Sequence, residues 1–370
     1  MQRPTVACLG LLLLLGATSV HAQWTVTQLT DNSHHDYDPQ ISDSNVVWSA
    51  PGANGTSHEV FLYNGDSTLQ LTNNVYYDMR PQVSGSIVVW QGSDGHDGEI
   101  FLYDGGTTRQ LTDNSYTDAY PQVSGASVVW CGYVDSGNSG DIFFYDGSTT
   151  RQLTNNGYNH NPQVSDSNVV WQGYDGTDWG IFLYDGNMTT QLTTNGEYTD
   201  PQVSGSNVVW RGYDGTDCDI FLYDGSTTTQ LTNNSHNDFD PQISGTNLVW
   251  QGHDGHDYEI FLYDLVAGQR RRLTDNSYDD YTPQISGSSV VWEGYDGHDW
   301  EIFLYDGNST IQLTDNGYDD KNPQVSGSNV VWRGHDGNDY EIFLATPVPE
   351  PSTLLSLSLT ALGILCFRRR

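Results

Sequence analysis

The fold is decided by one stretch, residues 208–225, which reads Val208-Val209-Trp210-Arg211-Gly212-Tyr213-Asp214-Gly215-Thr216-Asp217-Cys218-Asp219-Ile220-Phe221-Leu222-Tyr223-Asp224-Gly225. The pattern indicates a strand, an acidic turn, a second strand and a glycine turn, because Asp-Gly between two apolar runs favours a hairpin. Near copies of this stretch recur through almost the whole chain of 370 residues.

A Pro-Gln pair marks each copy, and a tryptophan follows it at a nearly constant distance. The prolines are Pro39, Pro81, Pro121, Pro162, Pro201, Pro241, Pro283 and Pro323. The tryptophans are Trp48, Trp90, Trp130, Trp171, Trp210, Trp250, Trp292 and Trp332. A repeat of about 40 residues that contains four short strands is typical of a β-propeller blade.

Four strands are expected in the copy that begins at Pro201. They cover residues 201–204, 207–210, 220–223 and 228–232. Pro201 should be the first residue of the inner strand, where a missing N–H is tolerated. The second and third strands are apolar at successive positions, which fits blades covered on both faces by neighbouring blades.

The count of outer strands predicts how the ring closes. The outer strand ends in Gln-Leu-Thr or Arg-Leu-Thr; the first such motif, at Leu29, precedes the first repeat, and the last repeat stops at Leu344. We therefore predict an all-β, eight-bladed propeller of four-stranded blades over residues 23–346. In it the N-terminal strand, residues 25–30, completes the last blade and removes the exposed edges.

The repeat resembles a known family over residues 24–344. Leu-Thr, a polar loop, Pro, Val-Val-Trp, Asp-Gly and Ile-Phe-Leu-Tyr-Asp follow one another as in TolB-type propeller repeats, which are relatives of the WD repeat. The resemblance implies a propeller fold. It says little about function, because such propellers serve as scaffolds, binding platforms and enzyme accessories.

Both ends of the chain carry targeting patterns. Arg3, the apolar run 7–16 and the small residue Ala22 predict a signal peptide over residues 1–22. The tail, residues 347–370, contains Pro349-Glu350-Pro351, an apolar stretch expected to form a short helix, and Arg368-Arg369-Arg370.

This tail resembles the PEP-CTERM sorting signal of Gram-negative bacteria. The resemblance implies recognition by an exosortase, transient membrane association through the C-terminal helix, and delivery to the cell surface or extracellular matrix. The alternative is an ordinary single-pass anchor.

The formal net charge of −34 argues against nucleic acid as a partner, since phosphates need basic residues. It suits cations, cationic partners or simple solubility. In a four-stranded blade, the loop before the inner strand and the hairpin between the second and third strands share one face, and most acidic residues fall there. Arg270, Arg271 and Arg272 are expected on the opposite face.

Asp-Gly-x-Asp recurs in six blades, usually followed by an acid at the start of the third strand. Carboxylates at this spacing can converge on a hard cation such as Ca²⁺, which takes oxygen ligands. The predicted metal ligands are Asp94, Asp97, Glu99, Asp175, Asp178, Asp214, Asp217, Asp219, Asp254, Asp257, Glu259, Asp296, Asp299, Glu301, Asp336, Asp339 and Glu341. The alternative is a solvated face on which the first Asp and the Gly serve only the turn.

Aromatic residues beside these acids suggest a sugar ligand, which has apolar C–H faces and hydroxyl donors. The predicted ligand-binding rings are Tyr174, Trp179, Tyr213, Tyr258, Tyr295, Trp300 and Tyr340. The alternative is packing between blades.

No motif for catalysis is present: there is no Gly-x-Ser-x-Gly nucleophile turn and no glycine loop of the kind that binds phosphate. We therefore predict a non-catalytic binding protein whose acidic face binds a divalent cation, a glycan or both, with calcium as the only expected cofactor. The alternatives are a propeller-type polysaccharide lyase or hydrolase that uses the central opening, and a scaffold for a surface protein.

Overall fold

A computed structural model of the protein describes residues 24–52, 55, 57–134, 140–194 and 198–348. These residues form strands and no helix, so none of their elements is a helix long and apolar enough to cross a membrane. The predicted signal peptide and the sorting residues Pro349, Glu350, Pro351, Arg368, Arg369 and Arg370 lie outside the described residues.

The strands form eight four-stranded sheets, the blades. From blade one to blade eight, the inner strands are β2 (Tyr37–Ser42), β6 (Met79–Ser84), β10 (Asp118–Ser124), β14 (Asn159–Ser165), β18 (Tyr198–Ser204), β22 (Asp238–Ser244), β26 (Asp280–Ser286) and β30 (Asp320–Ser326). The second strands are β3 (Asn45–Pro51), β7 (Ile87–Ser93), β11 (Ser127–Gly132), β15 (Asn168–Tyr174), β19 (Asn207–Tyr213), β23 (Asn247–His253), β27 (Ser289–Tyr295) and β31 (Asn329–His335).

The third strands are β4 (His58–Tyr63), β8 (Gly98–Tyr103), β12 (Asp141–Tyr145), β16 (Trp179–Tyr184), β20 (Cys218–Tyr223), β24 (Tyr258–Asp264), β28 (Trp300–Tyr305) and β32 (Tyr340–Pro347). The outer strands are β5 (Thr68–Gln70), β9 (Thr108–Gln110), β13 (Thr150–Gln152), β17 (Thr189–Gln191), β21 (Thr228–Gln230), β25 (Gln269–Arg272), β29 (Thr310–Gln312) and, for blade eight, β1 (Trp24–Gln28).

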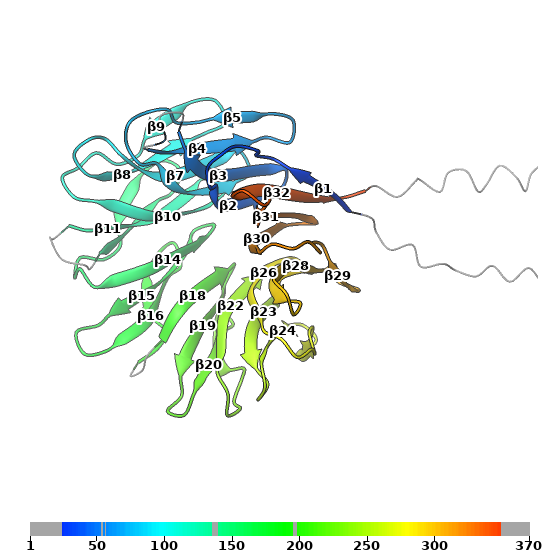
Figure 1. Ribbon diagram of the computed structural model, residues 1–370. Coiled ribbons are helices and arrows are strands. Elements are labelled where there is room, and N and C mark those ends of the chain that lie inside the picture. Colours follow the sequence, from blue (N-terminus) through cyan, green and yellow to red (C-terminus); the bar gives the residue numbers. More distant parts are fainter. Residues whose placement is uncertain (1–23, 53–54, 56, 135–139, 195–197, 349–370) are drawn as a thin grey trace, which may run out of the picture. The chain divides into compact units, whose positions relative to one another are not determined.

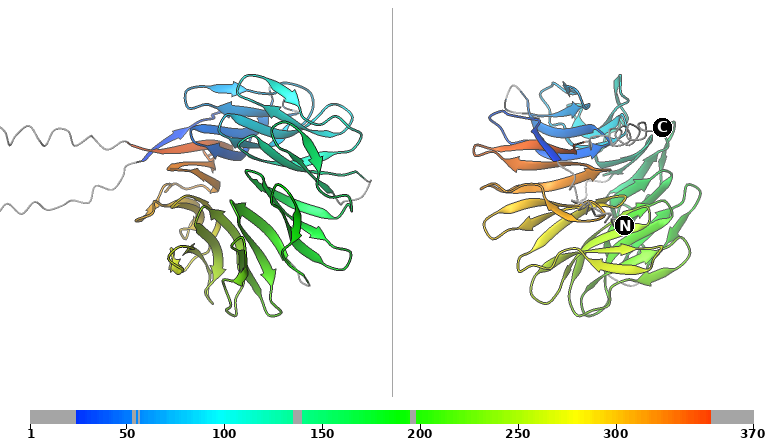
Figure 2. Two further views of the ribbon diagram at one scale, coloured as in Figure 1. Left: turned by 180° about the vertical axis from the view of Figure 1, so that it is seen from behind. Right: turned by 90° about the vertical axis from the view of Figure 1, so that its right-hand side faces the viewer.

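Within the unit Val26–Thr346 the blades close into a ring, since inner strand β2 contacts both β6 and β30 (Figure 1). The sheet of blade eight has the strand order β1-β32-β31-β30, which confirms that the N-terminal strand completes the last blade. Just after β1, the Leu29 N–H donates to the Ile342 carbonyl at 2.7 Å. Figure 2 shows the blue and orange-red ends of this ring side by side in both views.

The successive apolar positions of the second strand divide between two blade interfaces. Val208 and Trp210 pack against blade four, in a cluster with Val170 and Ile181. Val209 points the other way and packs with Leu248 and Trp250 of blade six. The expectation that both faces of each blade are covered is therefore confirmed, and the absence of in-and-out alternation follows from it.

The repeat tryptophan in the second strand of each blade stacks on a phenylalanine of the third strand. Trp250 lies opposite Phe261 in the register, with ring centroids 5.6 Å apart. Its Nε1 donates to Asp238 Oδ1 at 2.9 Å, and Asn234 Nδ2 donates to Oδ2 of the same carboxylate at 2.7 Å. The Trp–Asp–Asn chain ties the loop before the inner strand to the core.

One prediction about the inner strand is wrong. In blade five the strand begins at Tyr198, three residues before Pro201, and a bulge separates Thr199 from Gln202. Asp200, at the bulge, has φ 54°, which is rare for a residue other than glycine. The residue before the repeat proline has φ between 50° and 57° in every blade: Asp38, Arg80, Tyr120, Asn161, Asp200, Asp240, Thr282 and Asn322.

Contacts between loops define two faces. The Cys218 N–H, at the end of a hairpin, donates to Oδ1 of Asn237 in the loop before the next inner strand. On the other face, the turns between inner and second strands of adjacent blades are joined, with Gly85 N–H donating to Ser42 Oγ at 2.9 Å. We call the first the acidic face; in blade five it comprises residues 213–217 and 232–237.

Candidate functional site

The Asp-Gly-x-Asp motif forms the tip of the hairpin on the acidic face in the six blades that carry it. In blade seven, Asp296 Oδ1 accepts hydrogen bonds from the N–H groups of His298 (2.8 Å) and Asp299 (3.3 Å), and Gly297 has φ 105°. These N–H groups, His298 first, lower the pKa of Asp296, so this carboxylate is ionised at neutral pH. Turn geometry thus accounts for the first Asp and the Gly, and only Oδ1 is used in the turn.

The acid at the start of the third strand is buried beneath the hairpin. In blade seven this residue is Glu301, whose side chain has no solvent exposure. Its Oε1 accepts from the Asn316 N–H at 2.8 Å, whereas Oε2 is buried and has no hydrogen-bond partner among the described residues. Burial raises the pKa of Glu301 to about 7.

A third carboxylate comes from the loop that follows the outer strand. Oxygens of Asp296, Glu301 and Asp315 lie within 4.8 Å of one another. We call this arrangement a carboxylate triad, and it recurs in blades two and eight at equivalent positions. Its members there are Asp94, Glu99 and Asp113 in blade two, and Asp31, Asp336 and Glu341 in blade eight.

Blade five has a different group, because Asn233 stands where the third triad acid would be. Asp214, Asp217 and Asp219 approach within 4.8 Å. Asp217 is only 7% exposed, and neither of its carboxylate oxygens has a hydrogen-bond partner in the described part of the chain. Gln230 Nε2 donates to Asp219 Oδ2 at 2.7 Å, and burial raises the pKa of Asp219 to about 6.

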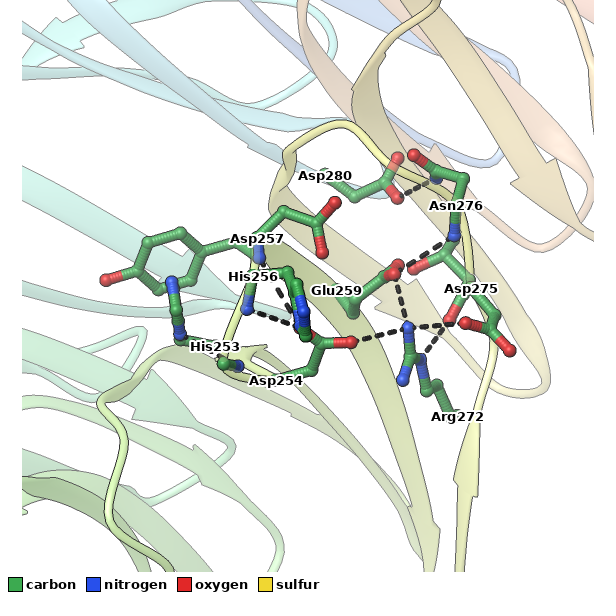
Figure 3. Close-up of polar contacts among 12 residues, drawn as sticks. His253, Asp254, His256, Asp257, Glu259, Arg272, Asp275, Asn276 and Asp280 are labelled. Atoms are coloured by element: carbon green, nitrogen blue, oxygen red, sulfur yellow. Dashed lines mark hydrogen bonds and ion pairs between the residues drawn. The ribbon is translucent and has the colours of Figure 1, made fainter.

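Blade six contains the triad positions together with an arginine (Figure 3). Arg272 Nη2 lies 2.9 Å from Asp254 Oδ2, 2.5 Å from Glu259 Oε1 and 2.7 Å from Asp275 Oδ1. Arg272 is therefore on the acidic face, contrary to the expectation from sequence. The outer strand β25 runs toward the acidic face, and Arg272 is its last residue. Asp254 and Glu259 also approach Asp257.

Other predicted metal ligands do not join these groups. Asp97, Asp299 and Asp339, the second acids of their hairpins, lie outside the triads of their blades, although each has a buried Oδ1 with no partner among the described residues. In blade four the third strand carries Gly180 at the acid position, and no third acid meets Asp175 and Asp178 within the described ranges.

The aromatic residues predicted to bind a ligand mostly pack on other rings. Tyr174 pairs with Trp179, and Tyr295 with Trp300, at centroid distances of 5.8 and 5.5 Å. Tyr258 contacts His253, Phe239 and Tyr281. Tyr340 contacts His35 and His335 and lies 4.4 Å beneath the Arg333 guanidinium. Tyr213 is 44% exposed. Neighbouring rings therefore occupy much of the surface that a sugar would need.

The central opening is a second concave region, and none of the predicted metal-binding or ligand-binding residues lines its cavity. A cavity of about 370 Å³ is lined by Pro-Gln residues of blades one, two, three, seven and eight and by the positive-φ residues that precede them, including Arg80 and Tyr120. The Arg80 guanidinium lies 4.3 Å above the Tyr120 ring. The signal in the sequence is that the residue before proline varies from blade to blade while Pro-Gln does not.

Comparison with known proteins identifies a sorting motif in the C-terminal segment and propeller structures with a similar fold. Residues 347–370 match the PEP-CTERM protein-sorting motif. No curated protein matches the chain. The motif marks an exported protein that an exosortase processes, with a surface or extracellular location in a Gram-negative bacterium.

The structural neighbours are propeller domains. The computationally designed Ika8 protein shares 19% identity at a TM-score of 0.59, covering 85% of this chain and 98% of its own. The β-propeller domain of the Trilobed protease from Pyrococcus furiosus, which has an open velcro topology, shares 12% identity at a TM-score of 0.57, with 77% and 99% covered.

Pyrococcus horikoshii acylaminoacyl peptidase shares 12% identity at a TM-score of 0.55 over 81% of this chain, which spans 57% of that peptidase. At these identities the likeness concerns the fold alone. It is consistent with the resemblance to TolB-type and WD-like propellers.

Proposed function

We propose that this surface protein is a non-catalytic binding propeller whose acidic face takes divalent cations, calcium in particular, at the carboxylate triads. Ca²⁺ accepts six to eight oxygen ligands at about 2.3–2.6 Å and tolerates irregular geometry. Three carboxylates from a hairpin tip, a strand and a loop supply part of such a shell, and backbone carbonyls and water can supply the rest.

One observation carries the proposal: Glu301 is fully buried, and its Oε2 has no hydrogen-bond donor among the described residues. A buried carboxylate oxygen without a partner is costly, and structures rarely leave one unexplained. Its neighbours in the triad, Asp296 and Asp315, are also acids, so nothing in the triad offsets its charge. A bound cation would satisfy the oxygen and relieve the repulsion together.

The test is a calcium titration of the mature chain after dialysis against EDTA. Each occupied site should raise the free energy of unfolding, by about 2.7 kcal/mol when calcium exceeds its Kd a hundredfold. Calorimetric titration gives the number of sites, and thermal melts give the stabilisation. Sodium chloride at matched ionic strength is the control, because screening alone reduces repulsion among exposed acids.

The proposal would be refuted if calcium up to millimolar concentration produced no heat of binding and no change in Tm. Equal stabilisation by sodium chloride would also refute it, because it would show that calcium only screens the charges of a solvated acidic face. Glycan binding stays a prediction for the same face. A glycan array probed with and without calcium tests it and separates sugar binding from a scaffold role.

A further inference from the structure

We propose that the guanidinium of Arg272 is the resident cation of blade six. By this inference blade six takes no calcium ion, while the equivalent triad of blade seven takes one. The inference rests on the proposed function and adds which sites exist and which residue decides it.

The first step is the equivalence of positions. Asp254, Glu259 and Asp275 occupy the hairpin, strand and loop positions that Asp296, Glu301 and Asp315 occupy in blade seven. In blade six all three carboxylates meet one nitrogen, Nη2 of Arg272, at 2.9, 2.5 and 2.7 Å. The nitrogen thus marks the point on which a triad converges, as Figure 3 shows.

The second step concerns the residue at the Arg272 position in the other blades. Arg272 pairs with Phe261 in the sheet register, as Gln312 pairs with Phe303 in blade seven. The residue before Leu-Thr is glutamine in all seven other blades: Gln28, Gln70, Gln110, Gln152, Gln191, Gln230 and Gln312. An amide can donate a hydrogen bond, but it carries no charge, so those blades have no built-in counter-ion at this position.

The third step is that Arg272 is fixed in place. Its Nε donates to the Thr274 carbonyl at 2.6 Å, which holds the guanidinium against the start of the loop that carries Asp275. Arginine keeps its charge at every relevant pH, and its planar fork suits carboxylates. A cation fixed among these three groups takes up oxygens of Asp254 and Glu259 and repels a divalent ion.

Asp257 does not change this conclusion. Its Oδ1 is buried without a partner among the described residues, but the same holds for Asp299 in blade seven. Asp257 approaches Asp254 and Glu259, whereas Asp299 lies outside the blade-seven triad, but Asp254 and Glu259 are already paired with the guanidinium.

The experiment is a count of calcium sites in the full mature chain by calorimetric titration and equilibrium dialysis. Arg272→Gln, which gives blade six the residue of the other blades, should bind one more calcium ion per chain than the wild type. Gln312→Arg, the reciprocal change, should bind one fewer. Arg272→Lys retains the charge and should leave the count unchanged. Circular dichroism and gel filtration verify that each variant is folded.

The outcomes are distinguishable. If the wild type binds calcium and both Arg272→Gln and Gln312→Arg keep the wild-type count, the inference is overturned and the proposed function stands. If the wild type binds none, both fail. If Arg272→Gln does not fold, Gln312→Arg decides alone: one site fewer supports the inference, and an unchanged count overturns it.

Discussion

Blades six and seven present the same three carboxylates at equivalent positions, yet their neighbours differ. In blade six, Arg272 pairs with all three carboxylates, whereas blade seven has Gln312 at that position and no arginine or lysine pairs with its triad among the described residues. Oε2 of Glu259 and Oε2 of Glu301 are both buried without a hydrogen-bond partner in the described part of the chain. One blade therefore carries its own counter-charge, and the other requires it from solution. A single residue at the end of the outer strand separates the two cases.

The largest expected effect comes from breaking the ion pairs of blade six. In calcium-free buffer, Arg272→Met should lower the free energy of unfolding by about 3 kcal/mol, because it leaves the buried Glu259 carboxylate without a partner cation. Urea denaturation measures the change. Gln312→Met in blade seven is the matched control and should cost less than about 0.5 kcal/mol, since Gln312 is exposed. Equal losses in the two variants would contradict the comparison.

The pH dependence of the calcium-free protein sharpens the comparison over all blades. Burial raises the pKa of Asp36 to about 8 and the pKa values of Asp118, Asp280 and Glu301 to about 7. The folded chain thus holds these protons more tightly than the unfolded chain. The stability that these four groups contribute is therefore complete below their ordinary pKa values, and it is lost as pH rises through their folded-state pKa values of about 7 to 8.

The Tm in EDTA should accordingly fall between pH 5.5 and pH 8. Calcium should reduce the slope, because it competes with protons for the triad carboxylates. Scanning calorimetry across this range, with and without calcium, measures both effects. A Tm that rises with pH in EDTA would show that the buried acids are not protonated in the folded state.

Glu301→Gln measures how much the blade-seven glutamate contributes to the dependence of Tm on pH. At pH 8 without calcium it should stabilise the protein by about 1 kcal/mol, since it removes a buried charge, and at pH 5.5, where burial keeps Glu301 protonated in the folded chain, the gain should be smaller. Its calcium count should fall by one. A variant that is destabilised equally at both pH values would point to lost packing or hydrogen bonding, and not to relief of a charge.

The smallest effect is expected at the exposed edge of the triad. Asp315→Asn should change calcium-free stability by less than about 0.5 kcal/mol, yet it should weaken calcium binding in blade seven. Asp306→Asn on the opposite face is the control, because it removes the same charge. The Asp306 carboxylate accepts hydrogen bonds from the Asn308 and Ser309 N–H groups, and an asparagine amide oxygen can accept them instead. The Asp306 variant should bind calcium as the wild type does, and equal weakening would favour a diffuse charge effect over a defined site.

Much of the fold could be predicted from local signals. The spacing of Pro-Gln pairs and tryptophans predicts eight blades, and the offset of Leu29 from the first repeat predicts closure by β1. These signals can be read within a single repeat, because the second and third strands of every blade are buried on both faces and therefore carry the same apolar pattern. The bulge at Asp200 was missed, since the residue before proline normally avoids helical conformations of either hand.

The site could be predicted only in part. The hairpin acids and Glu301 follow from the repeated motif, but Asp315 and Arg272 are brought to them by contacts between a hairpin and a loop on separate strands. The loop position holds Asp in blades two, six, seven and eight, Asn in blades one, three and five, and Thr in blade four. Each of these residues suits a polar loop, so the sequence alone offers no reason to assign the acid to a ligand set. The side-chain partners of Glu301 are equally a product of the tertiary structure.

The closure of blade eight has a consequence for how the ring is assembled. β1 begins at Trp24, ahead of every other strand of the ring, and its partner β32 ends at Pro347, where the sorting motif starts. The first strand must therefore wait, unpaired, until the last blade has been made and exported. Asp31 follows β1 and completes the triad with Asp336 and Glu341. A cation bound there would therefore help to hold β1 against β32.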